Sequence, residues 1–385
     1  MSVTFESLGV SPALVSALAA AGIREPFAIQ AATIPDGLAG RDVCGKAKTG
    51  SGKTLAFGVP ILDRVTKAKP GAPTACVLVP TRELANQVDQ VLAPLAKAVG
   101  WRTLAVYGGV SMEPQITALK RGVELIIATP GRAIDLIERG EMSLASVSIL
   151  VLDEADRMVD MGFLPQVQKI LYAASGPHQT MLFSATLDGA INQIVKTYLT
   201  DPVAHEVGAD EPTVEAMEHR FFHVHEMDKV KVAAAISRHA DRTLMFVRTK
   251  RMADKLVVAL KREGVNAGAI HGDLRQGIRE RALQDFTDGK LPVLVATDVA
   301  ARGIHVDDVD IVIHYDPADD HKAYLHRSGR TARAGRTGVA VTLSLWNEEN
   351  SVRMLQRRLG LSVPIAEVFS NDPRLADLHA WEPVR

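Results

Sequence analysis

Short apolar runs alternate along this chain with stretches in which apolar residues recur at helical spacing. Five such runs lie in the first half, at residues 74–80, 104–109, 124–130, 148–156 and 180–186. Six more follow, at residues 220–225, 243–249, 267–273, 292–299, 310–316 and 339–345. Runs of this length between helical stretches are typical of parallel strands covered by helices on both faces. The pattern therefore predicts the same α/β architecture twice.

The length of 385 residues also favours two domains, because one hydrophobic core rarely serves so long a chain. Residues 201–213 contain two prolines, one glycine and four acidic residues, the composition of an exposed connector. We place the first domain at residues 1–206, the linker at 207–214, the second domain at 215–368 and a short tail at 369–385. From residue 371 onward apolar periodicity is weak, so this end is expected to fray.

Composition narrows the possible partners and compartments. The formal net charge is −1, so nucleic-acid binding would have to come from a local basic surface rather than from the whole chain. The two cysteines, Cys44 and Cys76, lie in apolar strand-like runs and predict buried thiols in a reducing compartment. The first residues lack the features of a cleavable signal, and no apolar run is long enough to span a bilayer. We expect a soluble, cytoplasmic protein without a membrane partner.

Two segments about 100 residues apart indicate a nucleotide site. The sequence AKTGSGKT at residues 47–54 fits a phosphate-binding loop, in which Lys53 reaches the β and γ oxygens and the Thr54 hydroxyl meets Mg²⁺. The sequence DEAD at residues 153–156 follows an apolar run, so Asp153 fits a metal ligand and Glu154 a residue that positions water. The remaining loop residues expected around the phosphates are Ala47, Lys48, Thr49, Gly50, Ser51 and Gly52.

Polar and glycine-rich segments follow most of the predicted strands, where parallel sheets bind ligands. They lie at residues 80–83, 108–109, 129–132, 184–186, 271–273, 297–298 and 326–333. Together with the two nucleotide segments, these motifs resemble in order and spacing those of DEAD-box RNA helicases, over residues 1–350. The resemblance implies two tandem RecA-like domains, each a mostly parallel sheet flanked by helices, with ATP and Mg²⁺ as cofactors.

The same resemblance implies roles for residues outside the phosphate loop. Gln30 is expected to read the adenine edges, Phe5 is the isolated aromatic upstream, and Gly303 and His305 belong to the ribose side of the site. Arg330 and Arg333 are expected to stabilise the charge that develops on the γ-phosphate. The residues expected to couple hydrolysis to strand separation are Ser184, Thr186, Asp156, Asp298 and His326.

Contacts to RNA are implied in both halves of the chain. In the first half they are Thr81, Arg82, Gly109, Thr129 and Arg132; in the second half they are Arg248, Gly272, Gln276, Arg279 and Thr297. Most of these side chains suit phosphate or sugar, so sequence-independent binding is expected. The resemblance implies a monomer that closes two domains on one RNA strand and unwinds short duplexes locally. Protein partners would then supply the specific targets.

Three positions depart from the family pattern. Ile23 stands where an aromatic is usual, Phe27 where a small hydroxyl residue is usual, and His305 where an aspartate is usual. Loss of an aromatic face suggests weaker ATP binding, because stacking contributes about 1 kcal/mol beyond burial. The Phe27 ring removes one hydrogen bond near the adenine unless it packs against the base itself. A histidine at residue 305 would make ATP affinity dependent on pH.

Two other functions stay open. An ATP-gated RNA clamp that rarely unwinds would need the same residues, and a DNA-directed motor would be revealed by stimulation with DNA. Trp101, Trp346 and Trp381 match no motif and are interpreted as packing or surface aromatics. The histidines at residues 223, 225, 314 and 321 lack the partners of a metal site.

Overall fold

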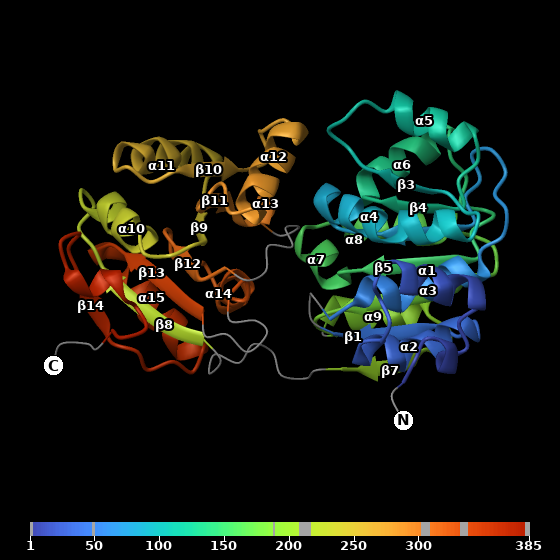
Figure 1. Cartoon of the computed structure of the whole chain (residues 1–385), viewed down its shortest axis with the longest axis horizontal. Coiled ribbons are helices and arrows are strands. Elements are labelled where there is room, and N and C mark those ends of the chain that lie inside the picture. The colour runs from blue at the N-terminus through green and yellow to red at the C-terminus, as the bar shows by residue number, and fades with distance from the viewer. Residues whose placement is uncertain are drawn as a thin grey trace. The chain divides into compact units, whose positions relative to one another are not determined.

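Each half of the chain folds into a sheet of seven strands with helices on both faces, which confirms the predicted α/β architecture (Figure 1). The computed structural model describes residues 3–47, 51–187, 189–207, 217–301, 309–331 and 338–381. The chain divides into two units, Met1–Ala209 and Asp210–Arg385. All strand pairs in both sheets are parallel.

The first unit contains the elements up to β7. Its strands are β1 (Val43–Lys46), β2 (Ala75–Leu78), β3 (Thr103–Val106), β4 (Leu125–Ala128), β5 (Ile149–Asp153), β6 (Gln179–Ser184) and β7 (Val203–Glu206). Its helices are η1 (Glu6–Leu8), α1 (Pro12–Ala20), α2 (Ala28–Leu38), α3 (Lys53–Arg64), α4 (Arg82–Ala98), α5 (Glu113–Lys120), α6 (Pro130–Glu138), α7 (Ala155–Asp160), α8 (Leu164–Ala173) and α9 (Gly189–Tyr198).

The second unit repeats this series. Its strands are β8 (Met217–His223), β9 (Thr243–Val247), β10 (Ala267–Ile270), β11 (Val293–Thr297), β12 (Ile311–His314), β13 (Gly338–Ser344) and β14 (Ile365–Glu367). Its helices are α10 (Lys229–Ser237), α11 (Lys250–Arg262), α12 (Gln276–Thr287), α13 (Asp298–Ala301), α14 (His321–Ser328), η3 (Trp346–Glu348), α15 (Glu349–Arg358) and η4 (Pro373–Ala376).

The two sheets have the same topology. The first has the strand order β3-β4-β2-β5-β6-β1-β7, and the second has β10-β11-β9-β12-β13-β8-β14. Adding seven to each strand number of the first sheet gives the second. A loop that follows a given strand therefore occupies the corresponding place in both units.

Each sheet buries apolar side chains on both faces, since successive residues of a strand point to opposite sides. Along β2, Ala75 and Val77 belong to the core beneath α1–α4, whereas Cys76 and Leu78 belong to the core on the side of α5–α9. The predicted burial of the cysteines is confirmed: Cys44 and Cys76 are buried free thiols. Burial raises the pKa of the Cys76 thiol to about 12.

Two segments that were predicted to be irregular are ordered parts of the fold. Residues Val203–Glu206, inside the predicted connector, form β7 and pair in parallel with β1. The predicted fraying is wrong for the described residues 371–381, because Leu375, Leu378 and Trp381 are buried in the core of the second unit. The Trp381 ring packs on Phe222 with ring centroids 4.6 Å apart. Long-range pairing and packing decide both segments, although their local composition is that of a loop.

Among the helices within the described ranges, none combines the length and the apolar character that crossing a bilayer requires.

The close approach of β1 to Phe183 explains a glycine just before the phosphate loop. An added β-carbon at Gly45 would lie 2.6 Å from two atoms of the Phe183 ring. The Phe57 ring, 5.6 Å away between centroids, packs against the same aromatic side chain. We predict that Gly45→Ala destabilises the first unit by about 1–3 kcal/mol, because overpacking forces neighbours to shift. Hydrogen exchange of the β1 and β6 amides in the full chain measures this loss.

Gly131 provides the matched control, because a β-carbon there meets nothing within 4 Å. Gly131→Ala lies in helix α6 and is expected to be neutral or to stabilise by up to about 1 kcal/mol. If the β1 and β6 amides exchanged at the same rate in both alanine variants, packing against Phe183 would not be the reason for a glycine at residue 45.

Candidate functional site

The phosphate loop lies between the end of β1 and the start of α3. Ala47 follows β1, and its N–H donates to the Ser184 carbonyl over 3.0 Å, which ties this strand end to that of β6. Lys53 is the first residue of α3, and its buried Nζ donates to the Ala47 carbonyl over 2.9 Å. The N-terminus of a helix together with a lysine favours bound phosphate. Lys48, Thr49 and Gly50 lie outside the described residues.

Gln30 connects the expected adenine site to this loop. Its buried amide accepts from the Phe27 N–H over 2.9 Å and donates to the Gly52 carbonyl over 2.9 Å. An amide has one further N–H and one further lone pair, which suits the edge of a base. The Phe27 side chain is 61% exposed, and a β-carbon at Gly52 would lie 2.5 Å from its ring.

The other two aromatic or apolar positions near this motif face inward. Phe5, predicted as a cofactor contact, is buried in the core of the first unit. Ile23 packs partly buried against the same core. Phe27 is therefore the exposed ring beside the phosphate loop.

The acidic motif begins where β5 ends. Asp153 is buried and accepts from the Glu154 N–H over 3.0 Å. Burial raises the pKa of Asp153 to about 7, although the nearby Lys53 ammonium lowers it. The charges of Glu154 and Asp156 also contribute to this raised pKa. A divalent cation would stabilise the ionised form of such a carboxylate.

The oxygen donors at this place fit Mg²⁺. Asp153 provides a carboxylate, and Thr54, in the first turn of α3, provides a hydroxyl. Mg²⁺ prefers oxygen ligands and is commonly held by one or two protein groups together with phosphate oxygens. These two residues are the ones that would hold the ion beside a bound nucleotide.

Three of the predicted coupling residues lie in contact. The Asp156 carboxylate accepts from the Ala185 and Thr186 N–H groups over 3.1 and 3.3 Å. The Ser184 hydroxyl accepts from the same Thr186 N–H over 3.3 Å. Asp156, in the first turn of α7, is thus joined to the segment that follows β6.

The predicted RNA contacts of the first unit follow three neighbouring strands. Thr81 follows β2 and caps α4, accepting from the Leu84 N–H over 3.3 Å, and Thr129 is the N-cap of α6 after β4. Gly109 follows β3 with a φ of 82°, and a β-carbon there would overlap the Arg82 guanidinium. Strand order β3-β4-β2 therefore brings these positions to one edge.

Arg132 completes this group at the start of α6. Its Nη2 donates to the Val110 carbonyl over 3.1 Å. Its Nη1 is buried and has no hydrogen-bond partner within the part of the chain that the structure describes. Such a donor is suited to a phosphate oxygen, because an unpaired buried donor is costly.

The predicted RNA contacts of the second unit follow the corresponding strands. Arg248 follows β9, Gly272 follows β10 and Thr297 ends β11, and these three strands are neighbours in the order β10-β11-β9. Gln276 and Arg279 are buried in the first turns of α12. Arg248 lies 3.4 Å from a carboxylate oxygen of Asp319 and 3.5 Å from one of Glu348.

The arginine-rich segment centres on a residue that the sequence analysis did not single out. The buried Arg327 guanidinium on α14 forms two bonds of 2.6 and 2.7 Å to the Asp298 carboxylate and donates to the Asp316 carbonyl over 2.8 Å. Asp298, predicted to couple, thus pairs with Arg327, the neighbour of the predicted His326. The repeated arginines at residues 327–333 were the sequence feature that could have identified Arg327.

The predicted charge-stabilising arginines are described only in part. Arg330 follows α14 and is buried. Arg333, Gly303 and His305 lie outside the described residues. Their roles therefore stay predictions.

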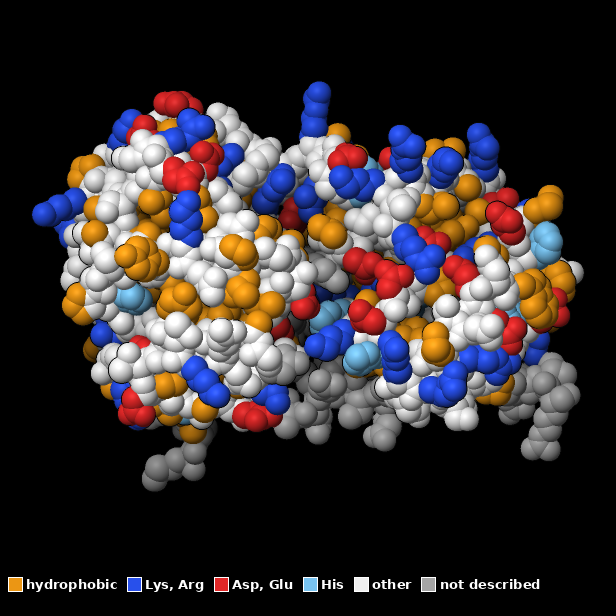
Figure 2. Space-filling view, turned by 180° about the vertical axis from the view of Figure 1, so that it is seen from behind, with side chains coloured by type: hydrophobic (Ala, Val, Ile, Leu, Met, Phe, Trp, Pro, Cys, Tyr) orange, Lys and Arg blue, Asp and Glu red, His pale blue; other side chains and the backbone are white. Residues whose placement is uncertain are grey.

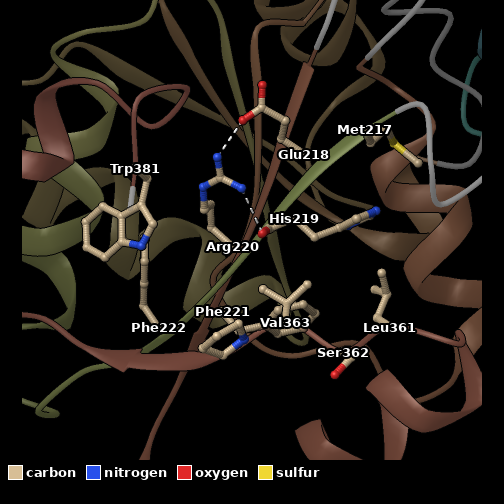
Figure 3. A pocket seen from close by; sticks show the side chains of 11 residues that line it. Met217, Glu218, His219, Arg220, Phe221, Phe222, Leu361, Ser362, Val363 and Trp381 are labelled. Atoms are coloured by element: carbon tan, nitrogen blue, oxygen red, sulfur yellow. Dashed lines mark hydrogen bonds and ion pairs between the residues drawn. The ribbon is translucent and has the colours of Figure 1, made fainter. Parts of the chain in front are cut away.

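A cavity of about 410 Å³ in the second unit lies apart from these residues (Figure 3). It is lined by residues 217–222 of β8, by residues 361–364 and by Trp381. Within it, Arg220 pairs with Glu218 and also donates to the His219 carbonyl over 3.1 Å. None of the predicted site residues lines this cavity.

On the visible face of the protein (Figure 2), basic side chains do not form a general positive coat. On the face in Figure 2, lysine and arginine side chains are interspersed with aspartate and glutamate. Attraction for a polyanion therefore depends on particular residues, such as the arginines at the strand ends.

Comparisons with known proteins match each of the two units to a helicase family. The family described as DEAD/DEAH box helicase matches residues 27–194, and the helicase conserved C-terminal domain matches residues 227–335. The chain is 41% identical to the DEAD-box ATP-dependent RNA helicase CshA of Bacillus licheniformis, over 93% of this chain and 74% of that protein.

Solved structures are similar over nearly the whole chain. Saccharomyces cerevisiae Dbp5 bound to RNA and ADP BeF3 has 31% identity and a TM-score of 0.78, covering 96% of both chains. A DEAD box protein from Methanococcus jannaschii has 34% identity and a TM-score of 0.52, covering 96% of this chain and 100% of that one.

The buried Asp153 carboxylate predicts a pH-dependent stability. Its pKa is about 7 in the folded protein, above the ordinary aspartate value of 3.8. Between these values the folded state binds the additional proton, so stability falls as the pH rises. Without nucleotide or Mg²⁺, we expect Asp153→Asn to be more stable than the parent at pH 8 by on the order of 2 kcal/mol. The difference should shrink towards pH 5.

Thermal unfolding across this pH range measures the difference. Asp160→Asn, at an exposed position at the end of α7, serves as the control and should change stability little at any pH. A constant difference between Asp153→Asn and the parent would contradict the buried charge as its cause.

Proposed function

The chain belongs to the DEAD-box family of ATP-dependent RNA helicases and is an ATP hydrolase, and we propose that it closes its two RecA-like domains on single-stranded RNA and opens short duplexes locally. The observation that carries the proposal is the distribution of its motifs over the repeat. Expected RNA contacts follow β2, β3 and β4 in one unit and the corresponding β9, β10 and β11 in the other. Two equivalent sheet edges, one in each unit, suit contacts to one continuous RNA strand.

In this proposal the first unit holds the nucleotide. Lys53 at the start of α3 binds the phosphates, and Gln30 reads the adenine. Asp153 and Thr54 hold Mg²⁺, which neutralises phosphate charge when bound. Glu154 orients the attacking water. These five residues lie on α2, on α3 and at or directly after the end of β5.

The second unit contributes once the domains close. Arg330 and Arg333 then stabilise the negative charge that develops on the γ-phosphate, an effect of about 10³ to 10⁵ in other nucleotide hydrolases. The Arg327–Asp298 pair fixes the start of this arginine-rich segment to the loop after β11. Closure would thereby couple RNA binding to hydrolysis.

RNA is the proposed partner, bound without sequence preference through phosphate and sugar. The threonines, glycines and arginines at the strand ends suit backbone contacts rather than base edges. We further propose a cytoplasmic monomer that obtains its targets from protein partners. The two buried free thiols are compatible with a reducing compartment.

Steady-state ATP hydrolysis tests the proposal. It is measured without nucleic acid, with single-stranded RNA and with DNA of the same sequence, at low and moderate salt. Strong stimulation by RNA is expected, and stimulation by DNA alone would contradict the choice of RNA. Unwinding of a short duplex then separates a helicase from an ATP-gated clamp, which would hold RNA and release it slowly.

Two variants test the assignment of the nucleotide site. Lys53→Ala removes the cation at the start of α3 and is expected to abolish nucleotide binding. Glu154→Gln keeps the size of the side chain and is expected to retain ATP-dependent RNA binding while turnover falls by about 10²-fold or more. Fluorescence titration and ATP hydrolysis measure the two properties. Normal turnover in either variant would contradict the assignment.

A further inference from the structure

Glu154 has an arginine partner within its own motif. The Arg157 Nη1 lies 2.8 Å from Glu154 Oε2, and both side chains are largely buried, at 11% and 4% exposure. Arg157 lies in α7, the helix of which Glu154 is the N-cap. The spacing of three residues places both side chains on one helix face. The pair is therefore built by local sequence, yet it is shielded from water by the unit around it.

The backbone at Glu154 is also unusual. Its φ of 54° and ψ of 49° are left-handed, a conformation that costs a non-glycine residue of order 1 kcal/mol or more. Glu154 and Asp201 are the non-glycine residues with positive φ in the described chain. The surrounding contacts hold Glu154 in this conformation, and the bond to Arg157 is one of them.

Charge crowding explains why Glu154 needs a cation. Three carboxylates occur within four residues, at Asp153, Glu154 and Asp156. Asp153 lies near Lys53, and Asp156 accepts two backbone N–H groups from the loop after β6. Arg157 supplies the corresponding partner for Glu154. Without this bond, the Glu154 side chain would lose a contact that fixes its direction.

We propose that Arg157 is a positioning residue for hydrolysis, which fixes the Glu154 carboxylate so that it can orient the attacking water. The inference rests on the proposed function of Glu154. Arg157 acts through Glu154 and is given no contact with nucleotide or RNA. Because an error of about 1 Å in a catalytic group can cost on the order of 10²-fold in rate, loss of this contact should appear in kcat.

The first test compares Arg157→Gln with Arg157→Lys. Glutamine can donate a hydrogen bond without charge, whereas lysine keeps the charge but not the planar fork. We expect Arg157→Gln to lower RNA-stimulated kcat by roughly 10- to 100-fold, with the affinities for ATP and RNA changed by less than about twofold. Arg157→Lys should recover part of kcat.

Arg139→Gln is the matched control. Arg139 follows α6 in the same unit and pairs with Asp135 over 2.7 Å, but that pair is exposed. We expect its kcat to equal that of the parent. Thermal unfolding of all variants separates a loss of fold from a loss of positioning, and Arg157→Lys remains informative if Arg157→Gln proves unstable.

The double variant Glu154→Gln/Arg157→Gln tests whether the arginine acts through Glu154. It should bind RNA in the presence of ATP as tightly as Glu154→Gln alone. An unchanged kcat in Arg157→Gln, or weaker binding of ATP or RNA in either background, would overturn the inference. If the parent chain showed no RNA-stimulated hydrolysis, the proposed function itself would fail, so the two failures are distinguishable.

Discussion

A buried carboxylate at the end of β5 is the constraint around which the nucleotide site is arranged. Burial raises the pKa of Asp153 to about 7, so the ionised form of this carboxylate is disfavoured in the folded protein. Lys53 partly offsets this effect from the first turn of α3. The arrangement requires β5, β6 and β1 to be neighbours, and the sheet has this order. A bound Mg²⁺ would offset the charge of this carboxylate.

The loops around Asp153 form a continuous network because their strands are adjacent. The Asp156 carboxylate binds the loop after β6, and the Ala47 N–H binds the Ser184 carbonyl at the end of β6. Arg157 restrains Glu154 from the helix that follows β5. The bonds from Asp156 and Ala47 therefore join segments at the ends of three strands, whereas Glu154 is restrained from within its own motif. Such shared contacts hold a catalytic carboxylate more firmly than a surface loop does.

The second unit uses the same topology for a different task. It has no phosphate loop after β8, and its buried ion pair joins Asp298 after β11 to Arg327 on α14. Arg327 also lies over the Phe246 ring, 5.3 Å from its centroid. A guanidinium with two carboxylate bonds and an aromatic contact is rigid. Arg327 is thus fixed on α14 by contacts to two other elements of the second unit.

Local patterns identified most of this architecture but missed the edge strands β7 and β14. The central runs, such as residues 148–156 and 180–186, are apolar enough to be recognised as buried strands without a structure. Residues Val203–Glu206 alternate between half-buried and exposed positions at the edge of the sheet, so their composition resembles a connector. The buried residues Leu375, Leu378 and Trp381 were also missed, because three apolar residues in so short a segment do not form a periodic pattern that predicts packing.

The sequence by itself determined the family, the two-sheet fold and the identity of the nucleotide motifs, because motif order and apolar periodicity are properties of the linear chain. The tertiary structure decided which of these residues meet. Glu154 and Arg157 are three residues apart, but the burial that makes their pair strong comes from the whole unit. Arg327 and Asp298 are joined only because β11 and α14 pack in one domain. Contacts across long sequence separation depend on strand order and register, which no local pattern encodes.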